Sequence, residues 1–132
     1  MKEVFEVGLD IIKKIQETQS EKLEQTGHLM AQAFMEGHKF FVSGSGHSHT
    51  MAEEMYARAG GFAFVVPILT SELTMTEHPT KSSNIERLSG YAKILVDLYG
   101  VSCGDVVLIA SNSGRNAIQS NLHLKPKIVM HM

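Results

Sequence analysis

The chain has 132 residues, 43% of them hydrophobic, which is enough to build the core of one domain. Its net charge of −2 and the lack of a basic cluster argue against nucleic acid as a partner. Its apolar runs are too short to cross a bilayer, its N-terminus lacks the apolar segment of a secretory signal, and its single cysteine, Cys103, cannot form an internal disulfide. We therefore expect a cytoplasmic protein with no membrane partner.

Residues 2–36 contain no proline and repeat apolar side chains at three- and four-residue spacing, which predicts helices. A single helix of this length would measure roughly 50 Å, longer than a small domain is wide. We therefore expect two helices, the second beginning near Thr18 or Ser20, with Gly37 at its end. These helices carry more apolar surface than a small sheet can cover, which predicts a homodimer or larger assembly.

Residues 38–132 alternate short β-rich runs with helical segments, which predicts an α/β core of three αβα layers around a parallel sheet. Pro67 should lie on a strand at the sheet edge, because proline cannot donate to a ladder. The segment 121–132 looks cut short, so the single domain 1–132 is expected to be incomplete at its C-terminal end. Strands are expected at 39–43, 62–69 and 105–110, with a short fourth strand at 127–131.

Three helical segments are expected in this core. One should follow the first strand and stop at Gly60-Gly61, and one should open after Ser111. Another should begin at the capping box 83–86 and continue to Gly100, with a clean apolar face. Residues 70–83 before it are expected to form a polar loop.

The first strand runs into a turn rich in glycine and serine, residues 43–48, and then into helical spacing. This order builds an anion site, because glycines permit a tight turn and the free N–H groups of a new helix face that turn. The same pattern also fits an ordinary βα turn, so alone it does not decide between the two interpretations.

A second hydroxyl-rich loop, residues 111–116, follows the strand expected at 105–110. In open α/β sheets, ligands bind beyond the carboxyl ends of the strands at a switch in strand order. Both loops are expected at those ends, so the pair predicts one polar, oxygen-rich ligand.

These two motifs resemble the sugar isomerase (SIS) domain, the phosphosugar-binding module of phosphoheptose isomerases, glucosamine-phosphate synthases and the etherases acting on N-acetylmuramic acid 6-phosphate. The likeness covers roughly residues 1–120 and is nearest to uncharacterised bacterial SIS proteins. It implies that Ser48 binds the phosphosugar, that Ser111 and Ser113 hold the phosphate, and that Asn116 replaces the family's usual Ser or Thr. We predict no cofactor and no metal. The predicted phosphosugar-binding residues are Gly44, Ser45, Gly46, Ser48, His49, Ser111, Asn112, Ser113 and Asn116.

Two positions depart from the phosphoheptose isomerases. Arg58 stands where the resemblance places their catalytic glutamate, and Glu54 stands where it places their metal-binding histidine. Arginine cannot accept a proton at neutral pH, which argues against heptose isomerisation. The remaining acid–base candidates are Glu77 and His78 in the polar loop, and neither is singled out by the sequence.

Phosphosugar binding is therefore the predicted function, either in a sugar-phosphate (aldose–ketose) isomerase or in a non-catalytic sensor or assembly subunit. His47, His49 and Glu53 could together bind zinc. We favour the alternative that the two histidines are loop residues that bind no metal, because no further ligand has an obvious position. A serine hydrolase with its nucleophile at Ser48 also ranks lower, because it leaves the second serine loop unexplained.

Overall fold

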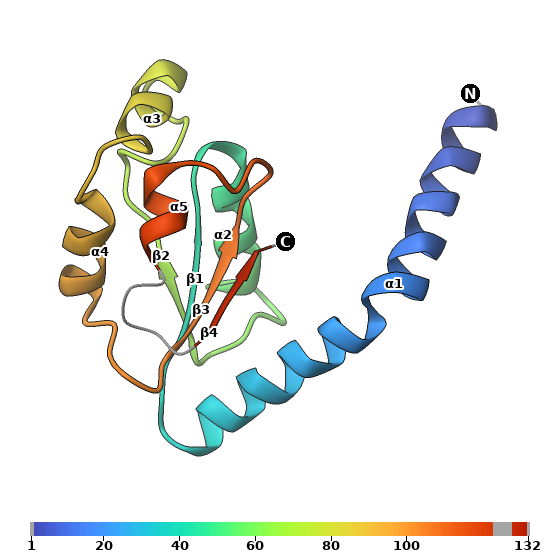
Figure 1. Cartoon of the computed structure of the whole chain (residues 1–132), viewed down its shortest axis with the longest axis horizontal. Helices are drawn as coiled ribbons and strands as arrows, with labels where there is room; N and C mark the ends of the chain where they lie inside the picture. The colour runs from blue at the N-terminus through green and yellow to red at the C-terminus, as the bar shows by residue number, and fades with distance from the viewer. Residues whose placement is uncertain (1, 123–127, 132) are drawn as a thin grey trace. The chain divides into compact units, whose positions relative to one another are not determined.

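The computed structural model describes the chain except for residues 1, 123–127 and 132, and it divides into two compact units, Met1–Gln32 and Ala33–Met132 (Figure 1). The first unit is almost all of helix α1 (Lys2–Met35), and the second is an α/β core. No helix among the described residues is long and apolar enough to cross a membrane.

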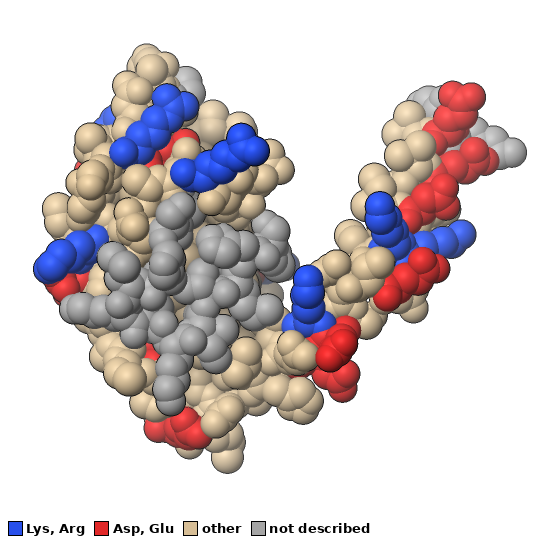
Figure 2. Space-filling model, viewed as in Figure 1, with Lys and Arg blue, Asp and Glu red and all other residues tan. Residues whose placement is uncertain are grey.

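Helix α1 is one continuous helix of 34 residues, so the prediction of two helices is wrong. Thr18 donates its hydroxyl to the carbonyl of Lys14 at 2.7 Å, and Ser20 donates to Gln16 in the same way. Hydroxyls that bond back to the preceding turn leave the helix intact and do not cap a new one. Acidic and basic side chains are both present on the surface of α1 (Figure 2), with Glu3, Glu6 and Asp10 preceding the pair Lys13-Lys14.

The helix ends where the sequence predicts. Gly37 has a φ of +75°, its N–H bonds to the carbonyl of Phe34 at 3.1 Å, and the N–H of His38 bonds to Ala33 at 2.8 Å. A left-handed glycine with such bonds is a common helix C-terminus, because it satisfies carbonyls that have no partner within the helix.

A four-stranded parallel sheet in the order β2-β1-β3-β4 forms the centre of the second unit (Figure 1). This confirms the predicted α/β fold with its parallel sheet and fourth strand, and Pro67 lies on edge strand β2 as expected. The register of β1 with β3 pairs Gly44 with Ala110, so the two central strands end side by side. The strands are β1 (Phe40–Gly44), β2 (Val65–Ile68), β3 (Val106–Ala110) and β4 (Ile128–His131).

Strand β2 begins three residues later than the predicted run at 62–69. The phenylalanines before it form an aromatic cluster instead. The ring centroid of Phe64 lies 4.9 Å from that of Phe34, 5.5 Å from Phe62 and 6.5 Å from Phe40. Aromatic packing of this kind overrides the β-propensity of the segment.

The helices differ more from the prediction than the strands do. The expected helix from Ser83 is two helices, because α3 starts at Pro79 and Gly90, with φ at +87°, separates it from α4. The helix after the first strand ends at Met55, well before Gly60-Gly61. The helical elements of the core are η1 (Gly46–His49), α2 (Thr50–Met55), α3 (Pro79–Ile85), α4 (Tyr91–Tyr99) and α5 (Ala117–Asn121).

Alternating side chains on the central strands place apolar groups on both faces of the sheet. Phe41, Val107 and Ile109 join one cluster with α4 and α5, while buried Ala52 of α2 belongs to the opposite face. Figure 1 shows α4 and α5 on one side of the sheet and α2 on the other. Both central strands are therefore buried along their whole length, and they present their carboxyl ends at one edge.

Candidate functional site

The first site loop, residues 44–49, folds tightly over the end of β1. A side chain at Gly44 would collide with the carbonyl of Ser48, so only glycine fits there. The N–H of Gly46 bonds to the carbonyl of Leu73 at 2.8 Å, and the N–H of Ser48 bonds to Ser45 at 3.1 Å. The structure therefore gives Gly44 and Gly46 roles in shaping the loop.

His49 lies beneath this loop. It is 9% exposed, its Nδ1 contacts the carbonyl of Gly46, and its Nε2 lies 3.3 Å from Oε1 of Glu53. Among the described residues, the linings of the two cavities at this edge do not include His49. Its contacts hold the turn in shape from below, although the sequence predicts a ligand contact.

The second site loop, residues 111–116, holds its serines in a defined orientation. Ser111 Oγ accepts a bond of 2.9 Å from the N–H of Gly114, and Ser113 Oγ accepts one of 3.4 Å from the N–H of Arg115. Each oxygen accepts a hydrogen bond within the loop, and its hydroxyl hydrogen remains available to donate to another group. Two hydroxyl donors on one loop suit a ligand group rich in oxygen.

The two loops meet around a small cavity of about 210 Å³. Six of the nine predicted phosphosugar-binding residues line it, so the expectation that the loops share one site fits this geometry. Gly44, Gly46 and His49 are the three that do not. The lining residues are Ser45, Ser48, Glu86, Ser111, Asn112, Ser113 and Asn116.

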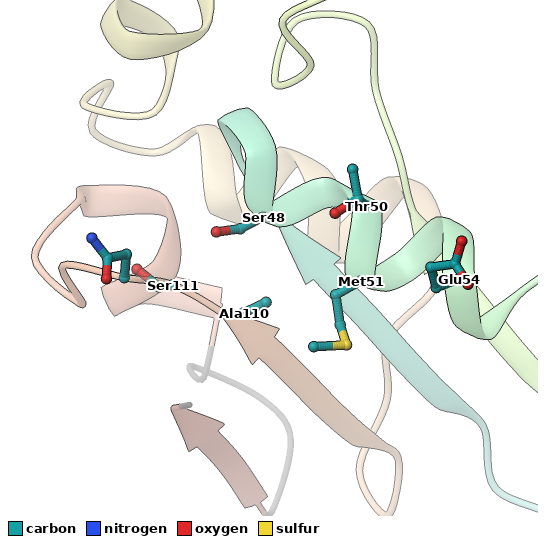
Figure 3. Close-up of a pocket in the computed structure, with 7 residues that line it drawn as sticks. Ser48, Thr50, Met51, Glu54, Ala110 and Ser111 are labelled. Carbon is teal, nitrogen blue, oxygen red and sulfur yellow. The ribbon is translucent and has the colours of Figure 1, made fainter. Parts of the chain in front are cut away.

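A second cavity of about 340 Å³ adjoins the first and shares Ser48, Ser111 and Asn112 with it. Figure 3 shows Ser48 of the first loop and Ser111 of the second on opposite sides of this space, with Ala110 and Met51 supplying its apolar part. The remaining lining residues are Thr50 and Glu54. A polar cavity beside a partly apolar one offers room for a ligand larger than a phosphate ion.

Glu86 is the site residue that the sequence interpretation missed. It caps the C-terminal end of α3, it lines the smaller cavity, and the Ser45 hydroxyl donates directly to its carboxylate. The sequence placed it in a capping box beginning at Ser83, a box that the structure does not form. No local pattern marks Glu86, because only the packing of α3 against the first loop brings it to the site.

The two acid–base candidates from the sequence, Glu77 and His78, form contacts with residues that do not line either cavity. Glu77 is exposed and bonded to Lys81, and this bond lowers the pKa of Glu77. The His78 side chain caps α3 by accepting from the N–H of Thr80 at 3.2 Å. Within the described part of the chain, neither side chain lines a site cavity.

The structure also shows the contacts of Arg58 and Glu54, the two positions that depart from the phosphoheptose isomerases. Arg58 forms an exposed ion pair with Glu54, and Glu54 lines the larger cavity. Across the residues that the structure describes, no three His, Cys, Asp or Glu side chains gather closely enough to hold a metal ion.

The parallel α/β sheet places two serine loops and a carboxylate around one polar cavity, and this lining suits an oxygen-rich molecule. Residues 5–125 match the SIS domain, so the chain belongs to the SIS domain family, whose members in general bind phosphosugars. This confirms the resemblance in the two loop motifs.

Two relatives place the chain more closely within the family. It is 44% identical over 117 residues to UPF0309 protein BH3325 of Halalkalibacterium halodurans, covering 89% of this chain and 48% of the relative. It is 42% identical over 96 residues to UPF0309 protein BOV_A0853 of Brucella ovis, covering 73% of this chain and 40% of the relative. The chain thus spans about half the length of these relatives, or less.

Proposed function

We propose that the chain binds a phosphorylated sugar in the cavity between the two serine loops. In this proposal the Ser111 and Ser113 hydroxyls bind the phosphate, and the polar side chains of Ser48, Asn112 and Asn116 line the rest of the ligand site. The observation that supports this proposal is that Ser111 and Ser113 line the smaller cavity while each accepts a backbone hydrogen bond, so both hydroxyl hydrogens remain available to donate to a ligand. Donors to a phosphate make charge-assisted hydrogen bonds, which are stronger than neutral ones.

Replacing one of these donors tests the proposal. Ser113→Ala removes a hydrogen bond to a charged group, which contributes about 1.5–3 kcal/mol, so it should weaken binding of a sugar phosphate about tenfold or more. Binding of the free sugar should change little. Ligand-observed NMR with a panel of sugar phosphates and free sugars measures both.

Ser89→Ala is the matched control, because Ser89 is exposed and outside the lining of both cavities as the structure describes them. It should leave both affinities unchanged. An equal loss for the phosphate and for the free sugar in Ser113→Ala would contradict the assignment of the phosphate to this loop.

A sugar-phosphate (aldose–ketose) isomerase is the second candidate, and the carboxylate of Glu86 in the cavity favours it. Such an enzyme removes a proton from the carbon beside the carbonyl, forms an enediol and returns the proton to the neighbouring carbon. A carboxylate within reach of the ligand can carry that proton. Glu86 therefore joins Glu77 and His78 as a candidate base.

Hydrogen exchange from deuterated water into bound sugar phosphates tests this chemistry. Loss of the base lowers the rate roughly 10²- to 10⁴-fold, so Glu86→Gln should abolish measurable exchange while Glu77→Gln and His78→Ala retain it. A parent protein that binds a sugar phosphate but exchanges no hydrogen with it would instead be a sensor or an assembly subunit.

We also propose a cytoplasmic, homo-oligomeric protein. The single cysteine supports a reducing compartment, and the exposed apolar side chains on α1 support association.

A further inference from the structure

We propose that Glu86 makes the site selective for sugar phosphates whose only ionised group is the phosphate, and that it excludes sugar acids. This inference rests on the proposed phosphosugar function and specifies, in addition, that the sugar part of the ligand carries no charge. It assigns to Glu86 a specificity role that holds whether or not the protein is an enzyme.

Backbone bonds fix Glu86 at the cavity from two sides. Its N–H bonds to the carbonyl of Ser82 at 2.9 Å, and its carbonyl accepts from the N–H of Ile118 at 3.2 Å. The second bond ties the end of α3 to the first turn of α5, directly after the second site loop. Glu86 is half-buried, so its carboxylate is held at the cavity by the packing of these elements.

The cavity lining offers two kinds of hydrogen-bonding group. Ser45 gives its hydroxyl hydrogen to Glu86, so that these two side chains offer acceptors to a ligand. Ser111 and Ser113 of the second loop accept backbone bonds and can offer donors. A sugar phosphate matches both kinds of group, because its phosphate accepts hydrogen bonds and its hydroxyls donate them.

The charge of Glu86 has no counter-charge in the cavity wall. Among the described lining residues there is no Lys or Arg, and the cations that follow in sequence, Arg87 and Arg115, are exposed. A half-buried carboxylate repels a second anion, since like charges across a binding interface cost several kcal/mol. The phosphate must then lie toward Ser113, and the sugar end must be neutral.

The experiment compares matched ligands. A panel of aldose phosphates from tetrose to heptose is titrated by calorimetry, each beside the aldonic acid phosphate made by oxidising its first carbon. The wild type should prefer the aldose phosphate by about tenfold or more. Glu86→Gln keeps the shape of the side chain and removes its charge, so it should reduce that preference about tenfold. Glu86→Ala should reduce it likewise.

Glu36→Gln is the control, because this exposed carboxylate lies before β1, at the opposite end of the strand from the site. It should leave the preference unchanged. If the wild type binds both ligands of each pair equally, or if the Glu86 variants keep the wild-type preference, the inference is overturned while phosphosugar binding stands. If the wild type binds no sugar phosphate, the proposed function fails and this inference fails with it.

Discussion

Asp105 connects the starts of the two strands that carry the site. Its side chain is buried, with 2% exposed, and its carboxylate accepts from the N–H groups of Lys39 and Ser102 at 2.8 Å each and from the Ser102 hydroxyl at 2.9 Å. Burial by itself would raise the pKa of Asp105, but these hydrogen bonds and the nearby His38 outweigh it and lower the pKa.

A lowered pKa in the folded state makes stability depend on pH. The stabilisation is fully present above the pKa of the unfolded carboxyl, about 3.9, and it is lost as the pH falls through the lower folded value. Asp105→Asn should therefore reduce the free energy of unfolding by about 1.5–3 kcal/mol at neutral pH. The difference from the wild type should shrink as the pH falls below about 3.9.

Urea unfolding of both proteins across this pH range measures the difference. Asp97→Asn is the control, because Asp97 forms an exposed ion pair with Lys93 on α4 and such pairs contribute little. A difference between wild type and Asp105→Asn that stays constant from neutral pH to pH values well below about 3.9 would contradict the role of the ionised carboxylate.

The sequence predicts those site residues that lie in a continuous loop motif, and it misses those that only the packing of distant segments brings to the site. Ser48, Ser111 and Ser113 could be proposed because each lies in a short polar loop directly after an apolar strand. Glu86 could not, because its place depends on how α3 packs against the first loop. The sequence predicts a ligand contact for His49 but does not tell whether a loop side chain turns outward or inward, and in the structure its ring is buried against the carbonyl of Gly46.

At the scale of elements, the strands were easier to predict than the helices. The run Val106–Ala110 is buried throughout, so its apolar character alone identifies it. Helix α3 was misplaced because two start signals compete in one stretch, and the proline at its first turn with His78 as cap prevails over the later box at Ser83. Helix α1 was divided wrongly because hydroxyl residues serve equally well within a helix and at its start.

Helix α1 is the element that favours self-association, because most of its apolar side chains are exposed. A helix with this much uncovered apolar surface gains most of its stability from packing against a partner. Acidic and basic side chains are both present along it (Figure 2), so the helix does not carry charge of one sign alone. The exposed side chains include Val4, Phe5, Val7, Leu9, Ile11, Ile12, Ile15 and Leu23.

We therefore predict that the protein associates with itself through α1. The chain has a mass of 14.6 kDa, and light scattering at micromolar concentration should give at least twice that mass. Ile12→Glu combined with Ile15→Glu places charges on exposed apolar positions and should shift the protein toward the monomer, because burying an unpaired carboxylate in an interface is strongly unfavourable. Gln16→Glu adds a charge at a polar position of the same helix and should leave the assembly intact. A monomeric wild type, or equal dissociation by Gln16→Glu, would refute association through the apolar side chains of α1.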